Sequence, residues 1–284
     1  QDISERKAAE QRIHRLTNTY AALSETNQAI VRSLDEAELF PQICRFAVDF
    51  GCMRMAWIGT LDPKTRQVHP VAHHGAGGEF LERVTVSADP ESPYGQGVAG
   101  RAIHGRAPCW MQDYLHEPGA RPWLSFAEAN GWRSAAALPL SRSGNVVGVL
   151  VLFSTEVNAF DDQIKNLLVE MSHDVSYALT QFANEAERAR SEEELRLAAK
   201  VFEQSAEAVV IADAGCRVLK VNRAFALSTG YSEHEALGMD ANFLLGIAGE
   251  DGGANPKIAA ALNREGAWQG DVVRRRKDAS SFPE

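Results

Sequence analysis

The sequence predicts an α+β protein in which two antiparallel-sheet domains are connected by long coiled-coil helices. Residues 9–34 and 164–182 carry apolar side chains at intervals of three and four, the spacing of a helix that packs along one stripe. After each of these segments, short alternating runs and turn residues indicate strands with short helices between them. Helices gathered beside antiparallel strands define the α+β class.

The first apolar stripe is typical of a coiled coil. A 3.5-residue repeat is the pattern of two helices wound around each other, and the charged Glu10, Arg12 and Arg15 leave only a narrow seam. We therefore expect a homodimer along this helix, and the alternative is a surface helix packed on its own domain. Asn27 in the seam is expected to cost stability and to fix the register. The predicted seam consists of Ile13, Leu16, Tyr20, Leu23, Asn27 and Ile30.

A similar stripe in residues 164–182 predicts a second dimerising helix, capped by Asn158 or Asp161. Residues 184–194 are too polar to bury a face alone, so we expect them to bridge the two domains as an exposed or coiled helix. The predicted seam residues of this second helix are Leu168, Met171, Val175 and Phe182.

The first globular block begins at about residue 35. Asp35 is the expected cap of a helix that ends at Gly51, and residues 62–65 form a turn. Residues 114–130 are an irregular helical excursion, which leaves a pocket between itself and the sheet. We expect strands at 53–61, 67–73, 107–111, 134–140 and 146–153, and short helices near 80–83 and 97–104.

The second block begins at about residue 198. Asn222 and Ser232 are each expected to start a short helix. A last strand begins at Ser281 and stops at the chain end, which predicts an excised, C-terminally truncated domain with an unpaired edge. The other expected elements are strands at 208–212, 218–221 and 268–274 and a helix at 258–263.

Composition bounds the class of protein. A length of 284 residues suggests two domains, and a net charge of −9 argues against a nucleic-acid partner. No apolar run approaches the roughly 20 residues that span a bilayer, and no charged-then-apolar leader pattern appears in the first residues, so we expect a cytoplasmic protein without a membrane partner. The cysteines lack metal or CxxC spacing and are expected to be reduced thiols: Cys44, Cys52, Cys109 and Cys216.

Residues 35–182 resemble a GAF domain of bacterial signalling proteins. The resemblance is carried by residues 101–103 leading to 112–113, the strand 133–140, the hairpin into 146–150 and the helix start 159–162. Ligand cavities are mostly apolar with a few placed polar groups. On that ground the candidate pocket residues are Trp57, His73, Tyr94, Trp110, Trp123 and Trp132.

Residues 199–284 resemble a PAS domain, and residues 2–7 resemble the exit of another, upstream PAS domain. The PAS resemblance is carried by residues 201–205, 221–225, 229–232, 237–238 and 268–270. The expected organisation is an N-terminal coiled-coil helix at 1–34, a GAF domain at 35–182, a helical linker at 183–198 and a PAS domain at 199–284.

Tandems of this kind commonly precede GGDEF and EAL domains, which make and hydrolyse cyclic-di-GMP. The resemblance therefore implies a sensory and dimerisation module, not itself an enzyme, that controls such an effector downstream. The input region of a histidine kinase is an alternative. Ser172-His173-Asp174 resembles a kinase phosphoacceptor stretch but lacks the proline and arginine that usually follow, so His173 is expected at the surface.

Cofactor motifs are weak in this sequence. Gly95, Gly97 and Gly100 match G-x-G-x-x-G but follow a turn-rich acidic loop instead of a strand, which favours a loop entering a helix. His73 and His74 point to opposite faces of a strand and cannot chelate one metal together. In the stretch 238–244, which parallels flavin photosensors, Ala241 stands at the adduct-forming cysteine, so thiol–flavin photochemistry is not expected.

An enzymatic alternative rests on thiols. Some GAF proteins reduce methionine sulfoxide with pocket cysteines, and Cys52 and Cys109 are the candidates here. Neither has an obvious activating neighbour, which is typical of an inert thiol. A ligand sensor, a structural relay and a thiol enzyme thus stay open, and the sequence identifies neither the ligand nor a cofactor.

Overall fold

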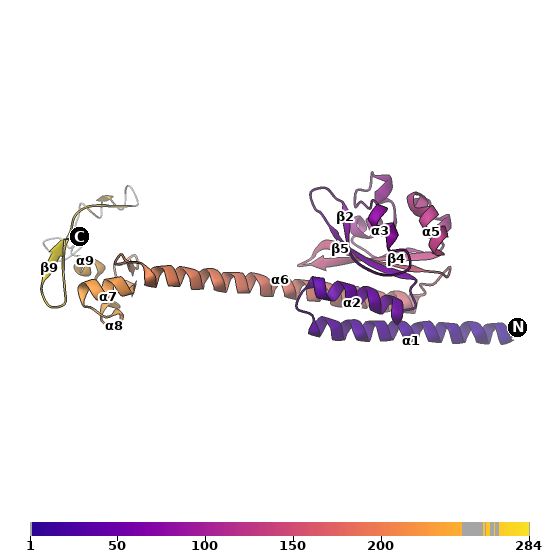
Figure 1. The fold of residues 1–284 in the computed structure, drawn as a ribbon, viewed down its shortest axis with the longest axis horizontal. Coiled ribbons are helices and arrows are strands. Elements are labelled where there is room, and N and C mark those ends of the chain that lie inside the picture. Colours follow the sequence, from indigo (N-terminus) through magenta and orange to yellow (C-terminus); the bar gives the residue numbers. More distant parts are fainter. Residues whose placement is uncertain (1, 246–257, 259, 262–263, 265–266, 284) are drawn as a thin grey trace. The chain divides into compact units, whose positions relative to one another are not determined.

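A computed structural model (Figure 1) describes residues 2–245, 258, 260–261, 264 and 267–283; in the first helix it gives side chains for Ile13 and from Leu16 onward. The chain divides into two compact units, Gln1–Glu187 and Arg188–Glu284. Helix α6 (Asp162–Gln204) contributes residues to both.

The first unit is built on a five-stranded antiparallel sheet in the order β2-β1-β5-β4-β3. Its middle strands carry side chains that are buried on both faces, because helices cover each side. Period-two alternation therefore divides the interior into two cores. The strands are β1 (Met55–Leu61), β2 (Val68–Gly75), β3 (Cys109–Met111), β4 (Ser134–Arg142) and β5 (Asn145–Ser154).

Two longer helices lie against one face of this sheet, α2 (Glu36–Asp49) and the first part of α6, and α1 (Asp2–Arg32) packs against α2 on the outer side (Figure 1). The predicted caps form, since Asp35 accepts the Glu38 N–H at 2.9 Å and Asp161 accepts the Ile164 N–H at 3.0 Å. The opposite face is covered by shorter elements: α3 (Glu79–Arg83), η1 (Pro93–Gly95), α4 (Val98–Gly105), η2 (Tyr114–His116), η3 (Pro118–Trp123) and α5 (Leu124–Asn130).

The apolar stripe of α6 packs on its own domain. Leu168, Met171 and Val175 are at most 4% exposed and belong to the core between the helices and the sheet, and Phe182 is partly buried against it. Their side chains are therefore not available to a second chain in this structure. The physical reason is that a helix lying on a sheet needs an apolar stripe of the same spacing as a helix lying on a helix.

Helix α1 divides the predicted seam between two sides. Leu23 is 6% exposed, and Leu16 and Ile30 pack partly buried against the same core. Ile13 and Tyr20 are 66% and 60% exposed, and Asn27 is exposed as well. Successive residues of the predicted seam thus alternate between the domain core and the solvent. The side of α1 that packs on the domain includes only one edge of the predicted stripe.

The second unit has a small core around Val218, Val221 and Phe225. Asn222 and Ser232 cap its helices as expected, and Ser232 forms a reciprocal capping box with Glu235. Half of the predicted helix at 258–263 lies outside the described residues. The elements are β6 (Val210–Ala212) paired with β7 (Val218–Val221), α7 (Arg223–Thr229), α8 (Glu233–Ala236), α9 (Ala241–Leu244), and β8 (Val273–Arg275) paired with β9 (Ser281–Pro283).

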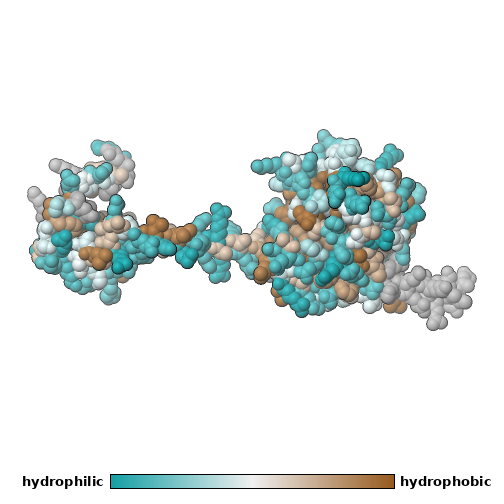
Figure 2. All heavy atoms as spheres, in the orientation of Figure 1, coloured by the Kyte–Doolittle hydropathy of each residue, from teal (hydrophilic) through white to brown (hydrophobic). Residues whose placement is uncertain are grey.

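Residues 188–201 of α6 are exposed, as expected for the charged stretch. Figure 2 shows hydrophobic atoms among hydrophilic ones along this segment, where Leu195 and Val201 are 71% and 72% exposed. Side-chain ion pairs such as Arg188 with Glu192 at 2.8 Å contribute about 0.3–0.5 kcal/mol each. Within the described part of the chain, no helix has the length and apolar character that crossing a bilayer requires.

Truncating Met171 to alanine should lower the free energy of unfolding of the first unit by about 2–5 kcal/mol, because its side chain is 2% exposed. Tyr177→Ala on the same helix removes a side chain that is 66% exposed, so it should change the free energy of unfolding by no more than about 0.5 kcal/mol. Urea denaturation followed by circular dichroism measures both. Equal effects would contradict the packing of α6 described above.

Candidate functional site

The face of the first sheet opposite α1, α2 and α6 carries an aromatic chamber. Trp57 of β1, Val151 of β5 and Ala137 of β4 lie side by side here because their strands pair in this register. Small alanines on β4 leave room for large rings on the neighbouring strands. The space that remains measures about 20 Å³, room for one water molecule. The aromatic residues that line it are Trp57, Phe80, Tyr114, Trp123 and Phe153.

Two buried indole groups have no hydrogen-bond partner among the described residues: Trp57 in the wall of the chamber, and Trp132 behind the rings of Phe80 and Phe153. Trp57 is 2% exposed and Trp132 is fully buried, and the Nε1–H of each finds no acceptor. An unpaired buried donor costs about 1–3 kcal/mol. Ring packing holds Trp132 in place, since it stacks 4.1 Å from Phe153 and meets Phe80 edge-on at 5.3 Å. Both indoles therefore keep an N–H donor that no acceptor among the described residues satisfies.

Helix α4 begins at the wall of the chamber. Its N-cap is Gly97, which has no side chain to accept the first N–H groups, and Val98 and Ala99 line the chamber. The first turn of a helix presents free N–H groups and a partial positive charge. Burial raises the pKa of the Tyr114 hydroxyl, so this neighbouring group stays neutral. The chamber is thus rich in donors and lacks a negative charge.

The three glycines of the G-x-G-x-x-G motif are required by packing. A Cβ on Gly97 would lie 2.2 Å from the ring of Trp123, and one on Gly95 would lie 1.8 Å from the carbonyl oxygen of Asp89. One on Gly100 would lie 2.2 Å from the carbonyl oxygen of Gly95. The motif therefore brings a loop against the start of α4, which agrees with the expectation of a loop entering a helix.

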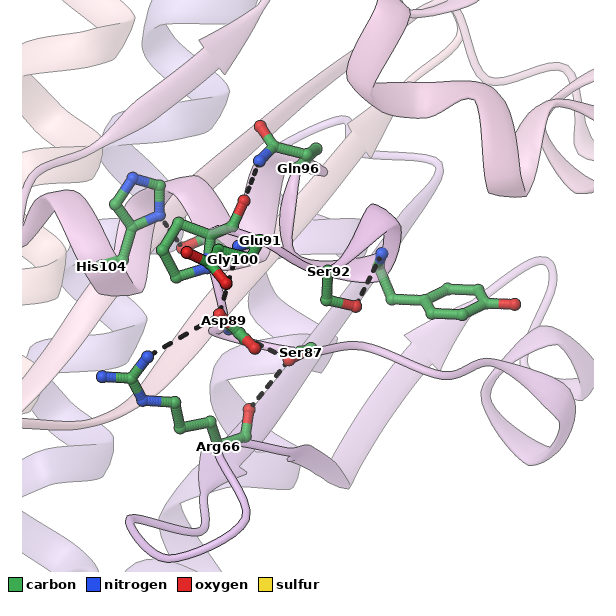
Figure 3. Close-up of polar contacts among 10 residues, drawn as sticks. Arg66, Ser87, Asp89, Glu91, Ser92, Gln96, Gly100 and His104 are labelled. Atoms are coloured by element: carbon green, nitrogen blue, oxygen red, sulfur yellow. Dashed lines mark hydrogen bonds and ion pairs between the residues drawn. The ribbon is translucent and has the colours of Figure 1, made fainter.

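Hydrogen bonds fix the loop that precedes α4 (Figure 3). Ser92 Oγ accepts the Tyr94 N–H at 3.2 Å, and Ser87 Oγ accepts the Asp89 N–H at 3.0 Å. Asp89 Oδ1 in turn accepts the Glu91 N–H at 3.1 Å. Side chains thus hydrogen-bond the N–H groups of the loop backbone. The loop so fixed holds Gly97 at the chamber wall.

An open groove of about 900 Å³ lies outside the chamber, between β2, α3 and α5. His73 lines it, whereas His74 faces the helices and lies 3.4 Å from Asp49, as expected from strand alternation. Phe80 lines both the groove and the chamber. Its ring is therefore a wall shared by the two spaces.

The predicted pocket residues separate into groups. Trp57 and Trp123 line the chamber, and Trp132 lies behind Phe80 and Phe153. Tyr94 is 44% exposed and lies 6.5 Å from Trp123, at the margin of the chamber. His73 lines the outer groove instead.

Trp110 does not belong to this site. It pairs with Ala136, and its ring packs on the other face of the sheet, 5.7 Å from Phe160. The sequence prediction missed Phe80, Tyr114 and Phe153. Alternation along the strand 146–153 was a signal for Phe153, which falls on the face of Val151, but no local pattern points to the other two rings.

The candidate thiols lie far apart. Cys52 is exposed, just before β1, and Cys109 is buried on β3. Three strand spacings separate β1 from β3, which is roughly 14 Å, whereas a disulfide needs Cα atoms within about 7 Å. Burial raises the pKa of the Cys109 thiol, and it raises that of Cys44 to about 12. In the part of the chain that the structure describes, no cluster of three metal-ligating side chains occurs.

A buried amide joins the end of α6 to the core of the second unit. Asn222 is 1% exposed, and its Nδ2 donates to the carbonyl oxygens of Phe202 at 3.1 Å and Glu207 at 2.8 Å. Its Oδ1 accepts the N–H groups of Val209 at 2.9 Å and Phe225 at 3.0 Å. This side chain thus ties the last turn of α6 to the segment just before β6 and to the start of α7.

The family model of the GAF domain matches residues 33–180, just over half of the chain, and that of the PAS domain matches residues 196–263. The chain belongs to the GAF domain family, with a PAS domain following in tandem. The two domains suggest a regulatory sensor module. A search of curated proteins found no match.

Several solved structures are similar. The GAF domain of an Acinetobacter phosphoenolpyruvate-protein phosphotransferase is 16% identical, with 60% of this chain and 97% of that one covered and a TM-score of 0.46. A putative GAF sensor protein from Burkholderia vietnamiensis is 16% identical over 60% and 98%, with a TM-score of 0.49. Free methionine-R-sulfoxide reductase from Neisseria meningitidis is 16% identical over 59% and 91%, with a TM-score of 0.48.

Gly100→Ala should lower the free energy of unfolding by about 1–3 kcal/mol, because the new Cβ would meet two backbone carbonyl oxygens within 2.5 Å. Gly105→Ala, in the same helix, has no atom within 4 Å of its Cβ and should be neutral or stabilising by up to about 1 kcal/mol. Denaturant titration compares them. A Gly100→Ala variant as stable as the wild type would contradict the packing role of the motif.

Cys109 should react with iodoacetamide more slowly than Cys52 at pH 8, because burial raises its pKa and only the thiolate reacts. Its reaction should quicken as the pH is raised, since the thiolate fraction then grows. Peptide mass spectrometry after timed alkylation of the folded protein measures both rates. Equal rates at the two positions would show that Cys109 is more accessible than the structure indicates.

Proposed function

We propose that this chain is the sensory input region of a signalling protein and that a small, flat molecule with hydrogen-bond acceptors binds in the aromatic chamber of the GAF domain. The unpaired indole N–H groups of Trp57 and Trp132 carry this proposal. Two buried donors without acceptors are costly to a folded domain, and a ligand that accepts both removes that cost. The free first turn of α4 supplies further donors on the same side.

Ligand entry requires Phe80 to move. The chamber of about 20 Å³ is too small for a metabolite, whereas the outer groove of about 900 Å³ is open. Because Phe80 is a wall of both, its displacement joins the two spaces and uncovers the ring of Trp132 beneath it. Helix α3, which carries Phe80, is only five residues long and is preceded by Gly77 at φ 102°. The groove is thus the entrance and the chamber is the binding site.

The signal leaves through α6. Its first half packs in the core of the GAF domain through Met171 and Val175, and its last turn is bonded to Asn222 of the PAS domain. A rearranged core that shifts this helix would reach the PAS domain through the buried amide. Switching of this kind requires two packing states whose balance the ligand changes.

The output that we propose is cyclic-di-GMP synthesis or hydrolysis by a GGDEF or EAL domain downstream. Support comes from the resemblance of the tandem to those that precede such domains. A histidine kinase is the alternative output. Its support is His173 on α6, which is exposed, as a phosphate-accepting histidine must be. Turnover of cyclic-di-GMP by the intact protein, with and without the molecule released from the chamber, decides between these outputs.

A thiol reductase of the methionine sulfoxide type is a weaker candidate. Its support is the pair Cys52 and Cys109, and the neutral state of Cys109 and the separation of the two thiols count against it. Turnover of free methionine sulfoxide that disappears in Cys52→Ser or Cys109→Ser would favour it over the sensor.

Absorbance and mass spectrometry of the freshly purified protein should reveal a stoichiometric small molecule. Trp57→Phe and Trp132→Phe should each bind the released molecule about tenfold more weakly, because each loses one hydrogen bond of about 1–1.5 kcal/mol. Trp110→Phe removes the same atoms on the opposite face of the sheet and should bind it like the wild type. Equilibrium dialysis measures all three affinities.

Two results would contradict the chamber site. One is a bound molecule whose affinity is unchanged in both chamber variants, which would place the ligand elsewhere. The other is a protein that carries no molecule and whose melting temperature no metabolite raises. The second outcome would favour a structural relay whose input comes from another part of the signalling protein.

A further inference from the structure

The tip of the β4–β5 hairpin is hydrogen-bonded to two hydroxyl groups of α6. The N–H of Ser141 donates to Oγ of Ser176 at 3.0 Å, and the N–H of Ser143 donates to Oγ1 of Thr180 at 3.1 Å. The two acceptors lie about one helical turn apart on the same side of α6. The contact therefore has two points, which together fix the rotation of the helix about its axis and its position along that axis.

The backbone of the hairpin is irregular where it meets α6. A bulge shifts the register, because Leu140 pairs with Gly148 whereas Ser141 pairs with Val146. A bulge disrupts the strand ladder locally and increases its twist. Ser143 follows in the two-residue turn, with a φ of 50°, and a turn residue has no residue opposite it. This irregularity accounts for two N–H groups that point at a helix instead of at the neighbouring strand.

The helix itself orients both hydroxyls as acceptors. Ser176 Oγ donates its proton to the carbonyl oxygen of Ser172 at 2.7 Å, and Thr180 Oγ1 donates to that of Ser176 at 3.0 Å. A hydroxyl has one proton and two lone pairs. The bond within the helix uses the proton, so the lone pairs accept the N–H groups of the hairpin.

These bonds define the setting of α6 more sharply than its apolar stripe does. Val175 and Leu179 lie fully buried beside the two hydroxyls, in the core between the helices and the sheet. Hydrophobic burial has no preferred direction, whereas a hydrogen bond weakens steeply as it is bent. A small rotation of α6 that keeps the stripe buried therefore still breaks the two bonds.

The two bonds can open at low cost. Ser143 is exposed, and Ser141, Ser176 and Thr180 are half-buried, so water reaches the groups that separate. An N–H that exchanges a hydroxyl partner for water loses little, in contrast to one that is left unpaired in a core. We call these two bonds, from Ser141 to Ser176 and from Ser143 to Thr180, the hydroxyl latch.

The same hairpin forms a wall of the aromatic chamber. Val151 and Phe153 of β5 line the chamber, and Ala137 of β4 pairs with Val151. At the tip of the hairpin, Arg142 bonds Glu36 in the first turn of α2. A displacement of these two strands at the chamber is therefore carried to α6 by the latch.

We propose that the hydroxyl latch holds α6 in one setting against the sheet, and that movement of the β4–β5 hairpin turns α6 through it. Ser176 and Thr180 are positioning residues, since they act on the direction of α6. The part of the latch in signalling rests on the function proposed above, because a ligand would act on the hairpin through the chamber wall.

Distances between two spin labels on the whole chain test the latch. Lys64→Cys, in the exposed turn between β1 and β2, and Glu187→Cys, exposed on α6, place both labels within the first unit. Cys52→Ser and Cys216→Ser remove native thiols, and the two remaining cysteines are buried. With the latch intact, pulsed electron paramagnetic resonance should give one narrow distance distribution.

Removal of the latch should broaden this distribution or add a second distance. Ser176→Ala with Thr180→Val deletes both acceptors, whereas Ser176→Thr with Thr180→Ser keeps both hydroxyls and should retain the narrow distribution. Ser191→Ala removes an exposed hydroxyl from the same helix and is the matched control. An unchanged distribution in the variant without hydroxyls, or a broad one in the variant that keeps them, overturns the proposal.

Amide hydrogen exchange reads the bonds themselves. In Ser176→Ala with Thr180→Val, the amides of Ser141 and Ser143 should exchange about two- to tenfold faster, because each loses one hydrogen bond. The amide of Ala136, in the middle of β4, should exchange as in the wild type. Unchanged exchange at both serines would contradict the latch.

A variant of the chamber wall separates the latch from the ligand. Val151→Ala shortens a fully buried side chain of β5 and needs no bound molecule. It should alter the label distance when the latch is present, and not in the background of Ser176→Ala with Thr180→Val. The same change in both backgrounds, or none in either, overturns the latch as the contact through which the hairpin moves α6. A chamber that binds no molecule contradicts the proposed function instead, and these measurements do not depend on it.

Discussion

Burial of the middle strands on both faces is the constraint on which the first domain depends. β1, β5 and β4 carry apolar side chains at successive positions, so the sheet needs a cover on each side. Alternation assigns Ile58 and Leu152 to the helices and Trp57 and Phe153 to the short elements. The long helices and the chamber are therefore two consequences of one sheet.

The chamber shows why a folded domain tolerates unpaired donors. A buried aromatic ring removes about 150–250 Å² from water, worth roughly 4–6 kcal/mol at 25 cal/mol per Å². An unpaired indole N–H costs about 1–3 kcal/mol. Burial of Trp57 and Trp132 thus stays favourable without a partner for either donor, and the same donors remain ready to recognise an acceptor.

One helix serves both domains. α6 is anchored at its start by the Asp161 cap and by the core around Met171, and at its end by the Asn222 amide. Between these anchors its side chains are exposed and charged, so local ion pairs and helix propensity support it there. The tertiary contacts of α6 thus lie at its two ends.

The sequence by itself determined the fold class, the order of the strands along the chain, and the caps at Asp35, Asn222 and Ser232, because these depend on local spacing and on hydrogen bonds a few residues long. It also named Trp57 and Trp123 as pocket candidates, and both line the chamber. Only the tertiary structure decided on which face of the sheet, or on which side of its helix, each side chain packs. An apolar stripe at intervals of three and four on α6 has the same spacing whether a sheet or a helix packs against it. Trp110 and Trp57 lie on opposite faces of the sheet because of the register in which their strands pair. Phe80 and Tyr114 lie in very short helices, where the sequence has no periodic pattern from which the direction of a side chain can be predicted.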